Sequence, residues 1–339
     1  MKLLLKGLSP IYYSATKLRN KLYDKQILET VKLNTPVVCI GNISFGGSGK
    51  TPFTRWLCLQ DALVDKNIAI VSRAYRAKYS GDFLKLEEKH FQQPENYGDE
   101  ACMLASSLPN VDVYITNNKS KACEKLVANS SYDIILVDDG FQHRRLERDL
   151  DIVLLDTSVG IESYNRFPKG ELREDLSGLE RADVLVYSKA TTATPSLMDR
   201  LVNYTHDKAQ MVMGFDLGSP SRVTPNDSLE ILEKSFLNYI LVTAVGNPKQ
   251  VEESFKKSFG EAKDKLIFKD HHSFSSLDID MILHVMEKKK AKYILCTEKD
   301  YLKIRNKMKN SSSLYFVPQD YKLLAGKEEL DEKLRALFS

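Results

Sequence analysis

The feature that most restricts the fold is the glycine-rich segment Ser44-Phe-Gly-Gly-Ser-Gly-Lys-Thr51, which directly follows an apolar, β-branched run over Val37–Ile43. Its glycines allow the backbone N–H groups to wrap a phosphate, and a helix that starts after them points its positive end at the anion. Lys50 is placed to reach the β- and γ-phosphates and the Thr51 hydroxyl to bind Mg²⁺. The predicted nucleotide-binding residues are Ser44, Phe45, Gly46, Gly47, Ser48, Gly49, Lys50 and Thr51.

The alternative for this segment is a glycine-rich turn followed by an ordinary surface lysine. Ser44 stands where the common pattern has its first glycine, whereas the doubled Gly46-Gly47 resembles a variant in one branch of P-loop proteins. The intact Gly-Lys-Thr, with a strand before it and a helix after it, favours the nucleotide site.

Beyond residue 35 the chain alternates between short apolar runs and helical patterns. Continuous apolar strands separated by helices are typical of a parallel sheet covered on both faces. The expected strands are Val37–Ile43, Ile68–Val71, Val111–Ile115, Ile134–Val137, Ile152–Leu155 and Val184–Tyr187, with helices at Pro52–Leu63, Glu100–Leu108 and Ser120–Ala128. The expected fold class is α/β, with a P-loop core and a mainly parallel sheet.

A second series of elements follows the first, and 339 residues are enough for two domains. Its expected strands are Met211–Phe215, Tyr239–Val245, Leu266–Phe268 and Tyr293–Cys296, with helices near 248–259 and 276–289. The stretch from Thr191 to Pro195 is the expected linker. We therefore predict a nucleotide-binding domain over residues 36–194 and a smaller α/β domain over residues 195–339 that closes over the active site.

Residues 1–35 carry seven basic and two acidic side chains, a net charge of +5, whereas the other 304 residues sum to about −2. Ser9 and Pro10 have the pattern of a helix start, and apolar residues recur after them at helical spacing. An amphipathic basic helix of this length suits the membrane surface rather than a span. The alternative, a helix packed on its own domain, stays open at this stage.

The overall composition excludes several classes of protein. A net charge of only +3 provides no field for nucleic acid, and five scattered cysteines indicate reduced thiols rather than a disulfide scaffold or a zinc site. No apolar run is long enough to predict a spanning helix. No obligate protein partner is expected.

A strand that ends in two carboxylates follows at Ile134-Ile-Leu-Val-Asp138, with Asp139 next to it. A P-loop needs an acidic residue at the end of a neighbouring strand to hold its metal ion. Adjacent carboxylates repel one another unless a cation compensates them. Asp138 and Asp139 are therefore the expected metal-binding pair, although a turn that begins at Asp139-Gly140 is an alternative for Asp139.

The segment Asp138-Asp-Gly-Phe-Gln-His143-Arg-Arg, followed by Arg148-Asp-Leu-Asp-Ile, resembles the hallmark of tetraacyldisaccharide 4′-kinases, the lipid A pathway kinases of Gram-negative bacteria. The resemblance extends in family order from about residue 36 to residue 301, and Asn118-Lys119 departs from it where an Asp-Arg pair is commoner. The other matching segments are Gly41–Pro52, Tyr97–Glu100, Phe167–Glu174, Gly246–Pro248, Phe268–His271 and Thr297–Asp300.

The resemblance implies transfer of the γ-phosphate of Mg-ATP to the 4′-hydroxyl of an acylated glucosamine disaccharide 1-phosphate, at the cytoplasmic face of the inner membrane. It also implies that Asp99 and His271 form the base pair that accepts the hydroxyl proton, with Lys50 as a further catalytic residue. Glu100 is implied as an additional metal ligand, with the start of a helix as its alternative role. The implied substrate residues are His143, Arg173 and Glu174.

Two other functions are compatible with the phosphate-binding motif. A partition- or metal-insertion-type ATPase has the same doubled glycine, but commonly has a lysine where Phe45 stands. A nucleotide-gated binding module at the membrane would carry out no reaction and would not need the Asp99 and His271 segments.

Overall fold

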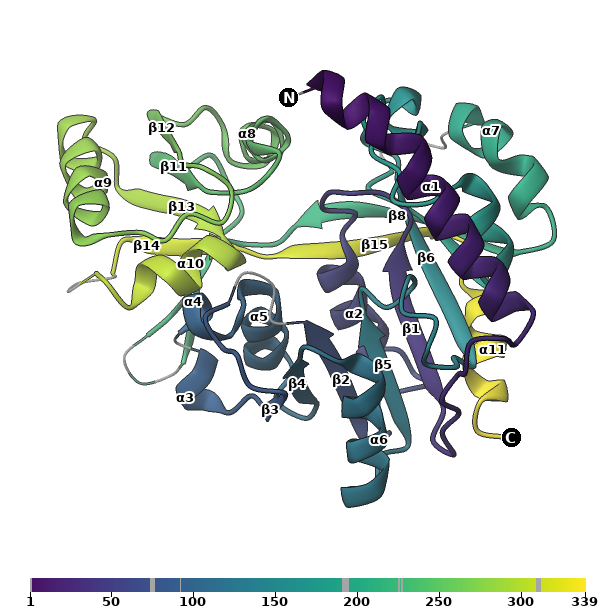
Figure 1. Ribbon diagram of the computed structural model, residues 1–339. Helices are drawn as coiled ribbons and strands as arrows, with labels where there is room; N and C mark the ends of the chain where they lie inside the picture. The colour runs from purple at the N-terminus through teal and green to yellow at the C-terminus, as the bar shows by residue number, and fades with distance from the viewer. Residues whose placement is uncertain are drawn as a thin grey trace.

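The computed structural model describes residues 2–73, 77–91, 93–190, 195–224, 226, 228–308 and 312–339. These residues form a larger and a smaller α/β unit, each built on its own sheet (Figure 1). In order across the sheet, the larger unit contains β15 (Gln319–Ala325), β8 (Ala209–Leu217), β7 (Val184–Ser188), β6 (Leu150–Asp156), β1 (Val37–Asn42), β5 (Ile134–Asp138), β2 (Ile68–Arg73), β4 (Asp112–Thr116) and β3 (Phe83–Lys85). Only the edge strands β15 and β3 pair antiparallel to their neighbours, so the predicted parallel sheet is confirmed.

Helices cover both faces of the larger sheet because side chains alternate along each buried strand. On β1, Ile40 packs with α2 on one face and Cys39 packs with α7 on the other. The first face carries α2 (Lys50–Cys58), α5 (Asp99–Ser107) and α11 (Glu328–Ala336), and the second carries α6 (Lys119–Asn129) and α7 (Pro195–Thr205). This arrangement brings the carboxyl ends of β1 and β5 next to the start of α2.

The smaller unit has a six-stranded sheet. Its strands, in order, are β10 (Leu229–Ile231), β9 (Ser221–Val223), β14 (Leu314–Val317), β13 (Tyr293–Thr297), β11 (Tyr239–Thr243) and β12 (Asp264–Ile267). Its helices are α8 (Pro248–Phe259), α9 (Ser276–Lys288) and α10 (Glu298–Arg305). The core clusters place α8 on one face of this sheet and α9 and α10 on the other.

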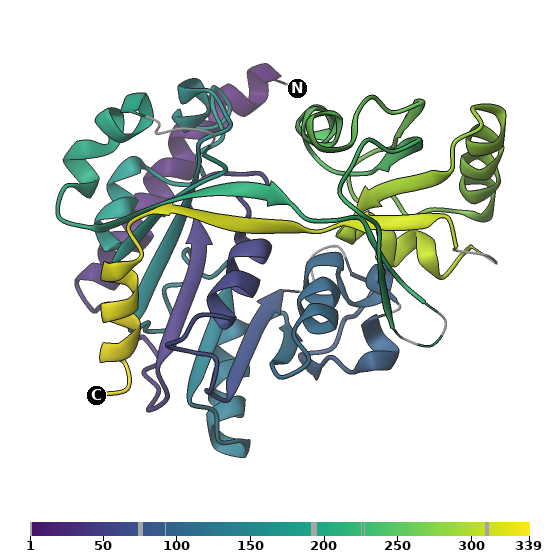
Figure 2. The ribbon, with the colours of Figure 1, turned by 180° about the vertical axis from the view of Figure 1, so that it is seen from behind.

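The sheet topology places the division between the units elsewhere than the predicted boundary at residues 194/195. α7, β8, β15 and α11 all belong to the larger unit, and the smaller unit comprises residues 221–317. Two adjacent strands, β8 and β15, connect the units, and only Pro318 separates β14 from β15 (Figure 2). The order of elements in the sequence does not reveal that the chain returns through β15 to the larger unit, because long-range pairing decides to which sheet a strand belongs. Thr191–Thr194 of the expected linker lie outside the described residues, and Pro195 begins α7.

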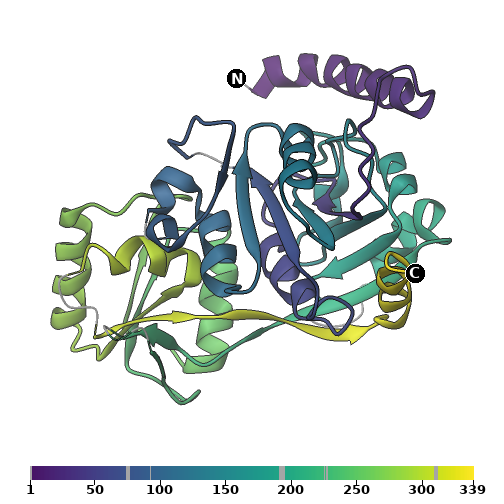
Figure 3. The same cartoon turned by 90° about the horizontal axis from the view of Figure 1, so that it is seen from below.

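The N-terminal helix α1 spans Lys2–Asp24, so it begins earlier than the expected start at Ser9. Proline removes a single backbone N–H, and here the helix continues through Pro10. Figure 3 shows α1 along the side of the larger unit. The remaining short elements are α3 (Glu88–Phe91), α4 (Pro94–Tyr97) and the 3₁₀ turns η1 (Ile161–Tyr164) and η2 (Leu176–Arg181).

One face of α1 is docked on the segment that follows η1. The buried Tyr13 hydroxyl accepts a hydrogen bond from the Phe167 N–H at 2.8 Å and donates one to the Leu172 carbonyl. Further along the helix, Asn20 donates to Glu174 at 3.3 Å. The packed-helix alternative is therefore confirmed for this face. Among the described residues, no helix combines the length and apolar character that a membrane crossing requires.

Candidate active site

The predicted phosphate loop, residues 44–51, connects β1 to α2 as the motif requires. Gly49 adopts φ 83° and Gly46 adopts φ 105°, conformations that glycine tolerates best. A Cβ at position 49 would also lie 2.1 Å from the Tyr321 hydroxyl oxygen and 3.2 Å from Phe215 Cζ. Gly49 is thus required both by its backbone and by the strands β8 and β15 that cover it.

Side chains from the sheet bind the outward carbonyls of this loop. Ser188 Oγ donates to Ser48 O at 2.9 Å, and the Tyr321 hydroxyl donates to Gly49 O at 3.1 Å. Lys189 Nζ donates to Gly47 O at 2.5 Å. With the carbonyls held on this side, the loop is arranged to turn its N–H groups toward an anion. The role of Lys189 could not be predicted from the sequence, because an isolated lysine after a strand has no distinctive pattern.

Lys50 and Arg173 both contact Asp139 at the end of β5. The distances from Asp139 Oδ1 are 3.3 Å to Lys50 Nζ and 3.2 Å to Arg173 Nη1. Burial opposes the charge of Asp139, but the cations of Lys50, Arg173 and Lys119 outweigh it and hold the pKa of this carboxyl well below its usual range. Asp139 is therefore a carboxylate that holds together Lys50, the predicted phosphate-binding lysine, and Arg173, a predicted substrate residue.

Asp138 has a different environment from its neighbour. Its Oδ2 accepts a hydrogen bond from Ser72 at 3.0 Å, whereas its Oδ1 is buried and has no partner among the described residues. Burial, together with the negative charge of Glu100, raises the pKa of Asp138 to about 6. An orphaned buried carboxylate oxygen of this kind fits a cation, and the Thr51 hydroxyl at the start of α2 supplies the matching ligand type.

No group of three or more His, Cys, Asp or Glu side chains in the described part of the chain could hold a metal ion by itself. Mg²⁺ usually takes only one or two carboxylates from a protein and completes its shell with water and nucleotide phosphates. Lys119 lies beneath this region, buried, and donates to the carbonyl oxygens of Asp138 and, at 2.7 Å, Asp139. Lys119 thus fixes the backbone that carries both carboxylates.

The structure brings Asp99 and His271 together, although 172 positions separate them in the chain. His271 Nδ1 lies 3.0 Å from Asp99 Oδ2, so α5 of the larger unit meets a loop of the smaller unit at this pair. Lys303 Nζ lies 2.6 Å from the same oxygen, and Lys299 Nζ lies 3.2 Å from His271 Nε2. Although burial opposes its charge, hydrogen bonding to His271 and the charges of Lys303 and Lys299 lower the pKa of Asp99.

The adjacent His272 has a separate structural role. Its Nε2 lies 3.1 Å from Asp278 Oδ2, and its ring stacks on Phe268 with centroids 4.9 Å apart. Asp278 and Ser275 form the capping box at the start of α9. His272 therefore stabilises a helix start, and only His271 of the two contacts Asp99.

The other predicted residues are distributed around the same edge of the larger sheet. Glu100 is the second residue of α5, next to Asp99, and its negative charge helps to raise the pKa of Asp138. Partial desolvation, with the positive charges of Lys119, Arg73 and Arg19, lowers the pKa of His143 to about 4. His143 is therefore uncharged at neutral pH, and it lies near several cations, one of which, Arg19, belongs to α1.

Glu174 differs from the expectation of a substrate contact. It is only 2% exposed, and its two oxygens accept hydrogen bonds from Gln142 at 3.0 Å, Arg181 at 2.8 Å and Asn20 at 3.3 Å. A carboxylate so buried and so fully bonded has a structural role, which is to join α1 to the larger unit.

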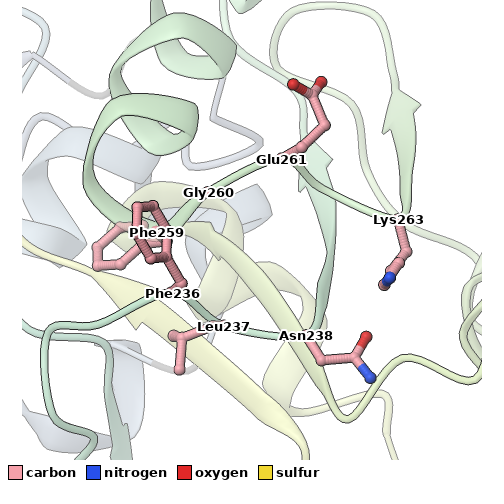
Figure 4. Close-up of a pocket in the computed structure, with 7 residues that line it drawn as sticks. All are labelled: Phe236, Leu237, Asn238, Phe259, Gly260, Glu261 and Lys263. Atoms are coloured by element: carbon pink, nitrogen blue, oxygen red, sulfur yellow. The ribbon is translucent and has the colours of Figure 1, made fainter.

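Thr297 caps α10 through a hydrogen bond from Asp300 N, so the matching segment Thr297–Asp300 contains a helix start. A pocket of about 520 Å³ lies on the smaller unit, beside the end of α8 (Figure 4). Its lining includes Phe236, Gly260 and Lys263 but none of the predicted site residues, so it is separate from the site described here.

Comparison with known proteins agrees with this geometry. The family model described as tetraacyldisaccharide-1-P 4′-kinase matches residues 1–339. A tetraacyldisaccharide 4′-kinase of Bdellovibrio bacteriovorus is 35% identical over 93% of both chains, and one of Flavobacterium psychrophilum is 31% identical over 98% of this chain and 97% of its own. A crystal structure of LpxK from Aquifex aeolicus in complex with ATP is similar with a TM-score of 0.77 and 28% identity, covering 100% of this chain and 99% of the other. The chain belongs to the tetraacyldisaccharide-1-P 4′-kinase family.

Proposed function

We propose that this chain transfers the γ-phosphate of ATP to the 4′-hydroxyl of a tetraacyldisaccharide 1-phosphate, as a step of lipid A biosynthesis. The observation that carries the proposal is the Asp99–His271 hydrogen bond of 3.0 Å, formed between α5 of the larger unit and a loop of the smaller unit. A sugar hydroxyl is a weak nucleophile, so a base has to accept its proton as the phosphoryl group moves. A nucleotide switch would not need such a pair.

In the proposed reaction, His271 Nε2 accepts the hydroxyl proton. Asp99 accepts a hydrogen bond from Nδ1–H, which fixes the tautomer and stabilises the imidazolium that forms. Lys299 lies 3.2 Å from Nε2, so the acceptor hydroxyl takes the place of this ammonium group when substrate binds. The base would then be uncovered only in the substrate complex, which limits hydrolysis of ATP by water.

The phosphate side of the reaction is assigned to the loop and its neighbours. The loop N–H groups and Lys50 would bind the nucleotide phosphates, and Arg173 would face the transferred group from the side of Asp139. Thr51 and Asp138, with Asp139 or Glu100 nearby, would hold Mg²⁺. When bound, Mg²⁺ neutralises charge on the phosphate oxygens.

The acceptor is an anion with lipid chains, and two features suit it. The cations Arg19 of α1 and Arg73 lie near His143, which is uncharged at neutral pH, and this group of side chains suits the 1-phosphate. The undocked face of α1 exposes Tyr12 at 48% and Leu18 at 60%, with lysines among them. A helix with such a face binds an anionic membrane surface, which we propose is the cytoplasmic face of the inner membrane.

The experiment that tests the function is incubation of the protein with γ-labelled ATP and purified tetraacyldisaccharide 1-phosphate. Kinase activity yields labelled lipid in an amount that matches ATP consumption. Labelled inorganic phosphate alone would identify an ATPase, and no turnover would identify a binding module; either result would refute the proposal.

A further inference from the structure

One arginine connects the phosphate-loop helix to the smaller unit. Arg55 lies on α2, and its guanidinium is 2.7 Å from Glu298 Oε1, at the start of α10. It also lies 2.7 Å from Asp320 Oδ1 and donates to the Gln319 carbonyl at 3.2 Å, directly after the crossing at Pro318. The Arg55 and Glu298 side chains are only 12% and 17% exposed. Such a pair resists separation, because a broken buried pair leaves an uncompensated charge.

The first turns of α10 carry side chains that each contact a different part of the site. Glu298 lies 2.7 Å from Arg55, and Lys299 lies 3.2 Å from His271. Asp300 accepts a hydrogen bond from Ala244 N at 3.0 Å, and Lys303 lies 2.6 Å from Asp99. A short, rigid helix therefore links the element that begins with Lys50 to the Asp99–His271 pair.

We propose that Arg55 and Glu298 are positioning residues, which set the alignment between the phosphate loop and the Asp99–His271 pair. The inference rests on the proposed kinase function and extends it. Phosphoryl transfer needs the attacking oxygen in line with the γ-phosphate, and a misplacement of about 1 Å can cost about 10²-fold in rate. Since Lys50 and His271 lie in different units, the contact between α2 and α10 acts together with the contacts of Asp99 to His271 and Lys303 to set the distance between the phosphate loop and the base.

The chain offers a matched control for this contact. Asp320 lies at the same distance from Arg55 as Glu298 does, but it is 61% exposed and sits on β15, in the same unit as Arg55. Removing the charge of Asp320 weakens the ion pair within one unit, whereas removing the charge of Glu298 weakens the pair between the units. Because Glu298 is also the more buried of the two carboxylates, the thermal stability of both variants is measured, which separates a loss of stability from a loss of alignment.

The test compares Glu298→Gln with Asp320→Asn and with Arg55→Gln, singly and combined. We expect Glu298→Gln to lower kcat about tenfold or more with the KM for ATP nearly unchanged, and Asp320→Asn to stay within about twofold of the parent. The double variant Arg55→Gln/Glu298→Gln should lose no more than Arg55→Gln alone. Thermal unfolding confirms the fold of each protein, and Glu298→Gln with Asp320→Asn decides the question if Arg55→Gln does not fold.

A second readout does not depend on the lipid acceptor. The single tryptophan, Trp56, is adjacent to Arg55, so its fluorescence reports the binding of a non-hydrolysable ATP analogue to α2. The NMR signal of the His271 ring reports the other end of the linkage. In the parent protein the analogue should change both signals, whereas in Glu298→Gln it should change only the tryptophan fluorescence.

Equal losses of kcat in Glu298→Gln and Asp320→Asn, additive losses in the double variant, or an unchanged His271 response in Glu298→Gln would overturn the proposal. Failure of the kinase function gives a different result. The parent protein would then leave the lipid unlabelled, while the analogue would still change the His271 signal in the parent and not in Glu298→Gln.

Discussion

Asp138 and Asp139 show how two identical, adjacent side chains acquire opposite properties. The carboxylate of Asp138 is buried and forms no ion pair with another described residue, and its pKa rises to about 6, whereas Lys50 and Arg173 lower the pKa of Asp139. The sequence predicted the pair but could not divide the roles, because the difference depends on partners that are distant in the chain. The structure favours Asp138 as the metal ligand and Asp139 as the residue that orders the cations.

The Asp99–His271 pair gives a prediction at the scale of single residues. Each alanine variant should lose about 10²–10⁴ in turnover, the range for a positioned base. The losses should be non-additive, since one partner has no role without the other. ATP affinity should change little. Steady-state kinetics of Asp99→Ala, His271→Ala and the double variant measure this.

His272→Ala is the control, because His272 contacts Asp278 and not Asp99. It should reduce the stability of the smaller unit slightly and leave turnover near that of the parent. A larger kinetic loss from His272→Ala than from His271→Ala would show that His272, and not His271, is the base. Additive losses from Asp99→Ala and His271→Ala would refute the pair.

Lys50→Ala should abolish lipid phosphorylation, since its charge matters most when negative charge redistributes in the transition state. The fold should persist, because Arg173 still pairs with Asp139 at 3.2 Å. Circular dichroism and turnover measured on the same preparation check both statements. Retention of most of the activity would contradict the assignment of the phosphate loop.

At the scale of elements, α1 has two faces with different partners. Tyr13 and Asn20 are bonded to the larger unit, while Leu18 and, directly after the helix, Lys25 are exposed. The sequence left the packed and the membrane-facing helix as alternatives, and the docked face establishes the first without excluding the second. Amphipathic periodicity cannot separate these cases, because it shows only that one side of a helix is apolar.

The exposed face of α1 can be tested without disturbing the docked one. The triple variant Ala15→Glu/Leu18→Glu/Lys25→Glu changes two exposed positions of α1 and the lysine directly after it. It should move the protein from the pellet to the supernatant with vesicles of anionic phospholipid, because a basic residue contributes about 1 kcal/mol near such a surface and the added carboxylates are repelled. The parent protein at high salt provides a comparison. Unchanged vesicle binding by a folded triple variant would show that this face is not the membrane contact.

The central strands could be predicted from the sequence, while the edge strands could not. Ile134–Val137 reads as a continuous apolar run, and β5 covers Ile134–Asp138. In contrast, β15 includes Asp320 and Lys322 and pairs only with β8, so its sequence lacks the signal of a buried strand. For the same reason Lys189 and Lys299 were missed at the site, because isolated lysines gain their roles only from long-range contacts.

At the scale of the whole molecule, His143 should make the free energy of unfolding depend on pH. The unfolded side chain takes up a proton near its ordinary pKa of about 6.5, whereas the folded one does so only near a pKa of about 4. Below about pH 7 the unfolded state therefore binds more protons, and His143 makes the protein less stable as the pH falls. We expect His143→Asn to lose less stability than the parent between pH 7.5 and pH 5, as measured by urea unfolding; parallel losses would contradict it.

The return of the chain through β15 has a consequence for the order in which the protein can fold during synthesis. The smaller unit is continuous in sequence, so it can be completed as soon as residues 221–317 have left the ribosome. The larger unit begins earlier but must wait for residues 319–336, which add β15 at its edge and place the fully buried Leu330 and Leu334 of α11 in its core. Gly49 of the phosphate loop lies beneath Tyr321 of β15. The loop therefore reaches its final form only after the smaller unit has already been synthesised.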